Sequence, residues 1–61
     1  MYIKCIDNEY VESELTINKV YEVINVAPFG AFGNQYEVIN DAGQNSYYWS
    51  SMFEKVRDGL K

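Results

Sequence analysis

The chain has 61 residues and a formal net charge of −4, from nine Asp and Glu against five Lys and Arg, with one cysteine and no histidine. This length allows a single domain, residues 1–61, because a second hydrophobic core would have too few residues to fill it. The composition excludes an internal disulfide, a Cys-rich zinc site and any catalytic pair that needs imidazole. We therefore expect no catalytic residue, no metal and no cofactor.

In the first half of the chain, β-prone segments alternate with loops. Residues 2–6 predict a first strand, and residues 7–14 hold four acids with little periodicity, which indicates a loop. The run from Val20 to Val26 is the strongest strand pattern, because it is β-branched and aromatic with a single acid. Pro28 ends this strand, since proline has no amide to give to the ladder.

The second half continues the pattern after a glycine-rich loop at residues 29–34. A strand is expected at Tyr36–Asn40, followed by a type I turn in which Gly43 takes the left-handed position. The partner strand runs from about Gln44 to Trp49.

The end of the chain predicts one helical turn and one strand. Ser50 can cap a single 3₁₀ turn, and residues 54–57 form the last strand, with 58–61 frayed. Five short strands in so few residues predict an all-β, partly open barrel. Its core is expected from Ile3, Cys5, Leu15, Ile17, Tyr21, Val23, Val38, Tyr48, Phe53 and Val56.

No targeting segment is expected. The first seven residues lack the apolar core of a signal peptide, and no apolar run approaches the ~18 residues of a membrane span. The lone Cys5 fits a reducing interior and is expected to be a buried, unreactive apolar residue. We expect a cytoplasmic protein that does not bind membranes, and the acidic balance argues against binding nucleic acid.

Two segments resemble SH3 domains. Residues 14–24, Glu-Leu-Thr-Ile-Asn-Lys-Val-Tyr-Glu-Val-Ile, resemble the diverging turn and second strand, and residues 49–56 resemble the 3₁₀ turn that leads into the last strand. The acidic stretch of residues 7–14 lies where SH3 domains carry their acidic loop. The motifs K-C-I-D-N, L-T-x-x-K-x-Y-E-V and Y-E-V-I-N-D-x-G look more closely like the small SH3-like proteins encoded by bacteriophages and prophages. This resemblance implies a five-stranded SH3-like barrel with one 3₁₀ turn before the last strand.

The peptide-binding motifs of SH3 domains are not matched. The A-L-Y-D-Y motif is replaced by Cys5-Ile6-Asp7-Asn8-Glu9, and the P-x-x-Y motif lacks its proline. Proline-rich peptides need aromatic ridges in fixed places, so we do not transfer that function.

Three features are candidates for recognition, and each has a structural alternative. The acidic loop is either solvated or an electrostatic site for a basic partner. In a strand, Tyr47 and Trp49 share one face and Tyr48 the other, so the outward pair either packs or forms a hot spot. Phe29 and Phe32 either plug the barrel or form a patch for a partner or for self-association.

The sequence therefore predicts a non-catalytic protein-binding module. The resemblance implies a phage or prophage accessory protein that binds and modulates a host protein, here one with a basic surface. The alternative is a sponge for a small ligand or nucleotide, working as a homo-oligomer with an aromatic pocket, and a mimic of nucleic acid is a third interpretation. We expect the acidic loop and the aromatic residues to form one binding surface, made of Asp7, Glu9, Tyr10, Glu12, Glu14, Phe29, Phe32, Tyr47 and Trp49.

Overall fold

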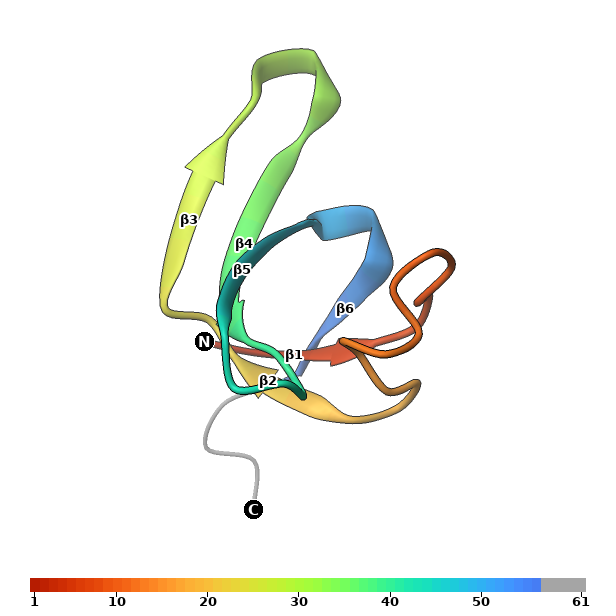
Figure 1. Ribbon diagram of the computed structural model, residues 1–61. Coiled ribbons are helices and arrows are strands. Elements are labelled where there is room, and N and C mark those ends of the chain that lie inside the picture. Colours follow the sequence, from red (N-terminus) through yellow and green to blue (C-terminus); the bar gives the residue numbers. More distant parts are fainter. Residues whose placement is uncertain (57–61) are drawn as a thin grey trace.

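The computed structural model describes residues 1–56, which form six short strands and two single-turn 3₁₀ helices and no α-helix (Figure 1). The strands make two three-stranded antiparallel sheets, with the orders β2-β1-β6 and β3-β4-β5. The protein is therefore all-β, as expected, but the sheets do not join into a closed barrel. The elements are β1 (Tyr2–Cys5), β2 (Val20–Glu22), β3 (Asn25–Pro28), η1 (Gly30–Phe32), β4 (Asn34–Ile39), β5 (Asn45–Trp49), η2 (Ser50–Met52) and β6 (Phe53–Val56).

The sixth strand arises because the expected strand at Val20–Val26 changes partner midway. β2 pairs with β1, whereas β3 pairs with β4. Between them, the amide of Val23 donates to the carbonyl of Met1 (2.9 Å) and the amide of Ile24 donates to that of Glu37 (2.8 Å). One extended segment thus serves both sheets, with a corner at Val23 and Ile24.

The β4–β5 connection has the predicted turn. Gly43 has φ +82°, and its amide donates to the carbonyl of Asn40 (2.9 Å). The buried Asn40 side chain completes the turn, since its Oδ1 accepts the amides of Ala42 and Gln44 (both 3.0 Å). The β4 strand begins two residues earlier than predicted, at Asn34.

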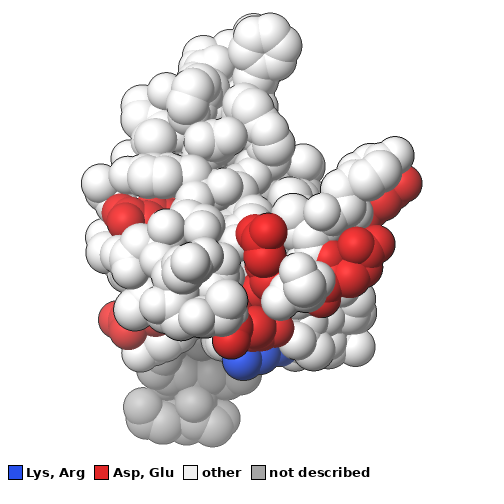
Figure 2. All heavy atoms as spheres, in the orientation of Figure 1, with Lys and Arg blue, Asp and Glu red and all other residues white. Residues whose placement is uncertain are grey.

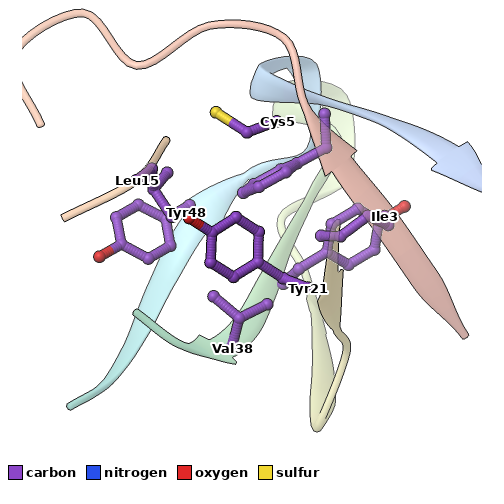
Figure 3. Packing of buried hydrophobic residues seen from close by; sticks show 8 residues of the cluster. Ile3, Cys5, Leu15, Tyr21, Val38 and Tyr48 are labelled. Carbon is purple, nitrogen blue, oxygen red and sulfur yellow. The ribbon is translucent and has the colours of Figure 1, made fainter. Parts of the chain in front are cut away.

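Strand alternation places one set of side chains from both sheets in a shared core (Figure 3). Phe53 lies at the centre of its aromatic part, where its ring makes edge contacts with Tyr21, Tyr36 and Tyr48 at centroid distances of 6.2–6.4 Å. Such edge-to-face pairs add to the energy of burial. The buried apolar residues are Ile3, Cys5, Leu15, Tyr21, Tyr36, Val38, Tyr48 and Phe53.

Three expected core positions differ from this set. Ile17 is 42% exposed because it lies in a tight turn in which the next residue, Asn18, has φ +72°. Val23 and Val56 are half-buried, because the first lies at the corner and the second pairs with Tyr2 on the outer face of its sheet. Tyr36 was missed, although it shares the inward face of β4 with Val38.

The predicted 3₁₀ turn is present at Ser50–Met52, but Ser50 does not cap it. Trp49 is the N-cap residue and no side chain bonds to the free amides. The last strand begins at Phe53, one residue before the predicted start. The predicted fraying of residues 58–61 and the strand position of Arg57 lie outside the described residues.

Candidate functional site

The acidic loop, residues 7–14, is held from its inner side. The amide of Val11 donates to the carbonyl of Asn8 (2.9 Å), and the amide of Leu15 donates to that of Val11 (3.0 Å). The Asn8 side chain donates to the carbonyl of Leu15 (2.9 Å), while Leu15 is fully buried and Val11 packs against the core. The inner residues fix the loop, and the acidic residues are left on its outer side.

Three of the four acids face solvent. Asp7, Glu9 and Glu12 are exposed, and none of them forms an ion pair with a lysine of residues 1–56. The Asp7 carboxylate accepts a local bond from the amide of Glu9 (3.0 Å). Tyr10 stands among them with 88% of its surface exposed and with φ +72°, a conformation that bulky residues rarely adopt.

Glu14, the fourth acid, has a structural role that its sequence context did not reveal. The Tyr48 hydroxyl donates to its Oε1 (2.6 Å), and the Asn40 side chain donates to the same hydroxyl (3.1 Å). Burial, and then the bond to the Glu14 carboxylate, raise the pKa of Tyr48. Glu14 therefore joins the end of the acidic loop to β5, and its carboxylate is already engaged within the molecule.

A second polar group, which the sequence analysis missed, holds the same end of the molecule. Asp41 Oδ1 accepts from Lys19 Nζ (2.8 Å) and from the Tyr21 hydroxyl (2.9 Å), and its Oδ2 accepts from Thr16 Oγ1 (2.6 Å). These bonds, the Lys19 bond first, lower the pKa of Asp41 to about 2. The Asp41 amide also donates to the carbonyl of Glu14 (2.8 Å). We call these residues the Asp41 clamp: it ties residues 14–21 to the β4–β5 turn.

The predicted aromatic pair lies on the outer face of the β3-β4-β5 sheet. Tyr47 and Trp49 alternate with the buried Tyr48 and remain 45% and 39% exposed. The ring of Phe29, just beyond β3, meets Trp49 edge to face at 5.3 Å. The Tyr47 hydroxyl accepts a 3.4 Å bond from the side chain of Asn25. We call Phe29, Tyr47 and Trp49 the aromatic face.

The loop of residues 29–33 does not plug the core. Phe29 and Phe32 are 46% and 81% exposed, and neither belongs to the buried cluster. The loop closes through the bond from the Phe29 amide to the Gly33 carbonyl (2.8 Å), with Gly30 and Gly33 at positive φ. Phe32 thus lies in the connection at the tip of the β3–β4 hairpin (Figure 1).

The predicted site residues therefore form two surfaces. The acidic loop follows β1, whereas the hairpin that carries Phe32 projects from the other sheet, and η2 lies between the two (Figure 1). Figure 2 shows the projecting hairpin without charge and acidic side chains along the arm formed by the loop. The expected single surface of acids and aromatics is thus divided.

Features that other kinds of functional site require are absent from residues 1–56. The structure has no pocket there, no group of three or more Asp, Glu, Cys or His able to hold a metal, and no helix able to span a membrane. The Cys5 side chain is fully buried, and this burial raises the pKa of its thiol. Deprotonation, which reactive thiols need, is therefore disfavoured.

Comparison with protein-family models, with curated proteins and with solved structures found no match to the chain. The arguments on function below depend on the residues and their geometry.

Proposed function

We propose that this protein is a non-catalytic module that binds a protein with a basic surface through its acidic loop. One observation carries the proposal: Tyr10 is almost fully exposed in a loop whose acids Asp7, Glu9 and Glu12 are also exposed and form no ion pair with the described lysines. Asp41 and Glu54 differ in this respect, because each contacts a lysine, and the carboxylates of Glu14 and Glu37 accept side-chain hydrogen bonds. An exposed tyrosine amid free acids fits a partner that supplies both a cleft and cations.

The two residue types would contribute differently. Tyrosine brings a large, rigid area of contact and a hydroxyl, so it is a frequent anchor at the centre of interfaces. Acids at the rim steer a basic partner into place and accelerate association more than they add to final affinity. The loop has its inner residues fixed in the core, which reduces the entropy lost when the partner binds.

We also propose that the fold is an open form of the SH3-like barrel. The order of elements supports it: a strand, a long acidic loop, a strand with a corner that serves both sheets, two hairpins and a 3₁₀ turn before a strand that pairs with the first. The sequence resemblance supports a phage or prophage accessory protein that acts on a host protein in the cytoplasm. An experimental structure tests the fold, because a solved chain whose corner lies elsewhere than Val23 and Ile24 would contradict it.

The binding proposal is tested with a charge-matched pair of variants. Glu12→Lys changes the acidic loop, and Glu22→Lys makes the same change on the exposed outer side of β2. The immobilised wild type should retain one host protein in stoichiometric amount. Glu12→Lys should slow its association at low salt, whereas Glu22→Lys should leave it unchanged. Equal behaviour of the two variants would contradict the proposal.

The Tyr10→Ala variant is a second test of the binding proposal. Because Tyr10 is 88% exposed and makes no core contact, its truncation should leave the melting temperature unchanged. Loss of a central anchor should weaken binding by ~2 kcal/mol or more, about thirtyfold. Unchanged affinity would remove Tyr10 from the site.

A ligand sponge is the second candidate, because Phe29, Tyr47 and Trp49 do gather on one face. Such a site would enclose a small molecule between two copies of the chain, since the single chain offers no pocket among its described residues. A small molecule that co-purifies with the protein, without any protein partner, would favour this candidate over the first.

A further inference from the structure

The outer face of the β3-β4-β5 sheet is unusual for a protein of this charge. Glu37 is the only charged residue at the outward positions of these strands, and the Asn45 side chain donates to its carboxylate (3.1 Å). The aromatic face and Ile39, which is 54% exposed, occupy the rest together with small and amide side chains. Exposed aromatic side chains gathered on a face with little charge are a candidate contact surface.

We propose that this face binds the same face of a second copy, in a two-fold symmetric dimer. A second copy as the occupant keeps the most acidic segment of each chain away from the interface. The free acids lie on the loop after β1, which projects away from the β3-β4-β5 sheet (Figure 1), so face-to-face copies keep their acidic loops apart. Repulsion between charges separated by more than about 8 Å is largely screened at physiological salt.

The register of the sheet supplies self-complementary shape. Ala27, Gln35 and Trp49 form one row across the three strands. With the two-fold axis beside Gln35, the Trp49 ring of one copy lies over the small Ala27 of the other. Large side chains over small ones are the arrangement by which packed sheet faces interdigitate.

The free edge of β3 offers no amide donors for strand addition, which disfavours pairing of a second copy along this edge. The backbone groups of an antiparallel strand point alternately toward and away from its neighbour. Because the Phe29 amide donates to Gly33, the backbone nitrogens of residues 26 and 28 point away from β4. Asn25 Oδ1 accepts the Val26 amide (3.0 Å), and Pro28 has no amide to donate. With both donors of this edge removed, the β3 edge is a poor template for another strand.

The dimer should be weak. Three strands ~4.8 Å apart and about five residues long give a face of about 14 by 17 Å, less than the ~800 Å² per partner of stable interfaces. Sedimentation equilibrium of the full chain from about 5 μM to about 1 mM covers this range. The weight-average mass should rise from 7.1 kDa toward twice that value. A mass of 7.1 kDa at every concentration would overturn the proposal.

A matched pair of variants locates the interface. Ala27→Glu places a carboxylate in the row with Trp49, and Val20→Glu places one on the outer face of the other sheet, at a position 46% exposed. Ala27→Glu should remain a monomer at every concentration, whereas Val20→Glu should dimerise as the wild type does. Equal behaviour of the two variants would overturn the proposal. If Ala27→Glu does not fold, Phe29→Ser at an exposed position takes its place.

The dependence on salt concentration distinguishes dimerisation from the binding of a basic partner. Burying the aromatic face brings two Glu37 carboxylates closer together, so dimerisation should strengthen or stay constant as salt rises, and Glu37→Gln should strengthen it severalfold. Binding through the acidic loop should weaken with salt. Dimerisation that salt abolishes would overturn the proposal, and it would leave the binding proposal untouched.

Discussion

The two sheets follow the same alternation but present different outer faces to solvent. On the β2-β1-β6 sheet, the outward positions include Lys4, Glu22 and Glu54, and Lys4 pairs with Glu54 across neighbouring strands (3.2 Å). On the β3-β4-β5 sheet, the outward positions carry Tyr47, Trp49 and one carboxylate. The fold thus requires the inward residues of both sheets, whereas the outward residues are free to differ. The face of the β3-β4-β5 sheet, with its single carboxylate, is the one for which we propose a second copy as partner.

The comparison assumes that the two sheets share one core, and Phe53→Ala is the strongest test of that. Its ring contacts aromatic residues of both sheets, so truncation should cost about 4 kcal/mol. A domain of this size has a total stability of roughly 3–9 kcal/mol. Circular dichroism should therefore show a melting temperature lowered by roughly 15–30 °C. A loss confined to one sheet, with the other intact by hydrogen exchange, would show two separate cores.

Asn40→Ala should have the next largest effect, because it affects the hairpin that carries the aromatic face. The buried side chain bonds to the amides of Ala42 and Gln44 and to the Tyr48 hydroxyl. Removing it takes these hydrogen bonds from the turn, one of them at the buried Tyr48, and should cost about 2 kcal/mol in urea unfolding. Asn45→Ala is the control, because this exposed residue should change stability by no more than about 0.5 kcal/mol. Equal losses would show that the turn does not depend on Asn40.

The Asp41 clamp joins the two regions, and pH tests it. The folded pKa of Asp41, about 2, lies below the ordinary value of 3.8. The carboxylate therefore adds stability that is fully present above about pH 4 and is lost as the pH falls toward about 2. Urea unfolding of Asp41→Asn should show a loss relative to wild type at pH 7 that shrinks below about pH 4. A loss independent of pH would show that the clamp does not depend on the charge of Asp41.

The smallest effect is expected on the charged outer face. Lys4 and Glu54 remain 35% and 55% exposed, so a double-mutant cycle to alanine should give a coupling of about 0.5 kcal/mol. The coupling should fall toward zero in 1 M salt, where the screening length is ~3 Å. A coupling well above ~1 kcal/mol would mean that this face is ordered by its charges and is not simply solvated.

Local sequence predicted most of the strands because hydrophobic alternation and breakers are local signals. Gly43 predicted its turn, and the alternation of Tyr47, Tyr48 and Trp49 predicted which ring would be buried. The corner at Val23 and Ile24 had no such signal. It depends on carbonyls of Met1 and Glu37, far away in the chain, and β-propensity does not record the choice of partner strand.

The candidate site was predicted in its composition and not in its arrangement. Asp7, Glu9, Tyr10 and Glu12 are exposed as the loop composition indicated. Glu14 belongs to the same acidic run, yet Tyr48, 34 residues away in the chain, holds its carboxylate. Such a pairing follows only from the packing of the loop on the β4–β5 hairpin, so the sequence could not separate Glu14 from its neighbours.

The burial of Cys5 gives the protein a built-in reporter of its own opening. It is the only cysteine of the chain, and its fully buried side chain lies on the central strand of the β2-β1-β6 sheet. An alkylating reagent can reach the sulfur only in molecules in which this part of the core has opened. The rate of alkylation under native conditions would thus report the population of open molecules, without denaturant and without a cysteine introduced by mutation.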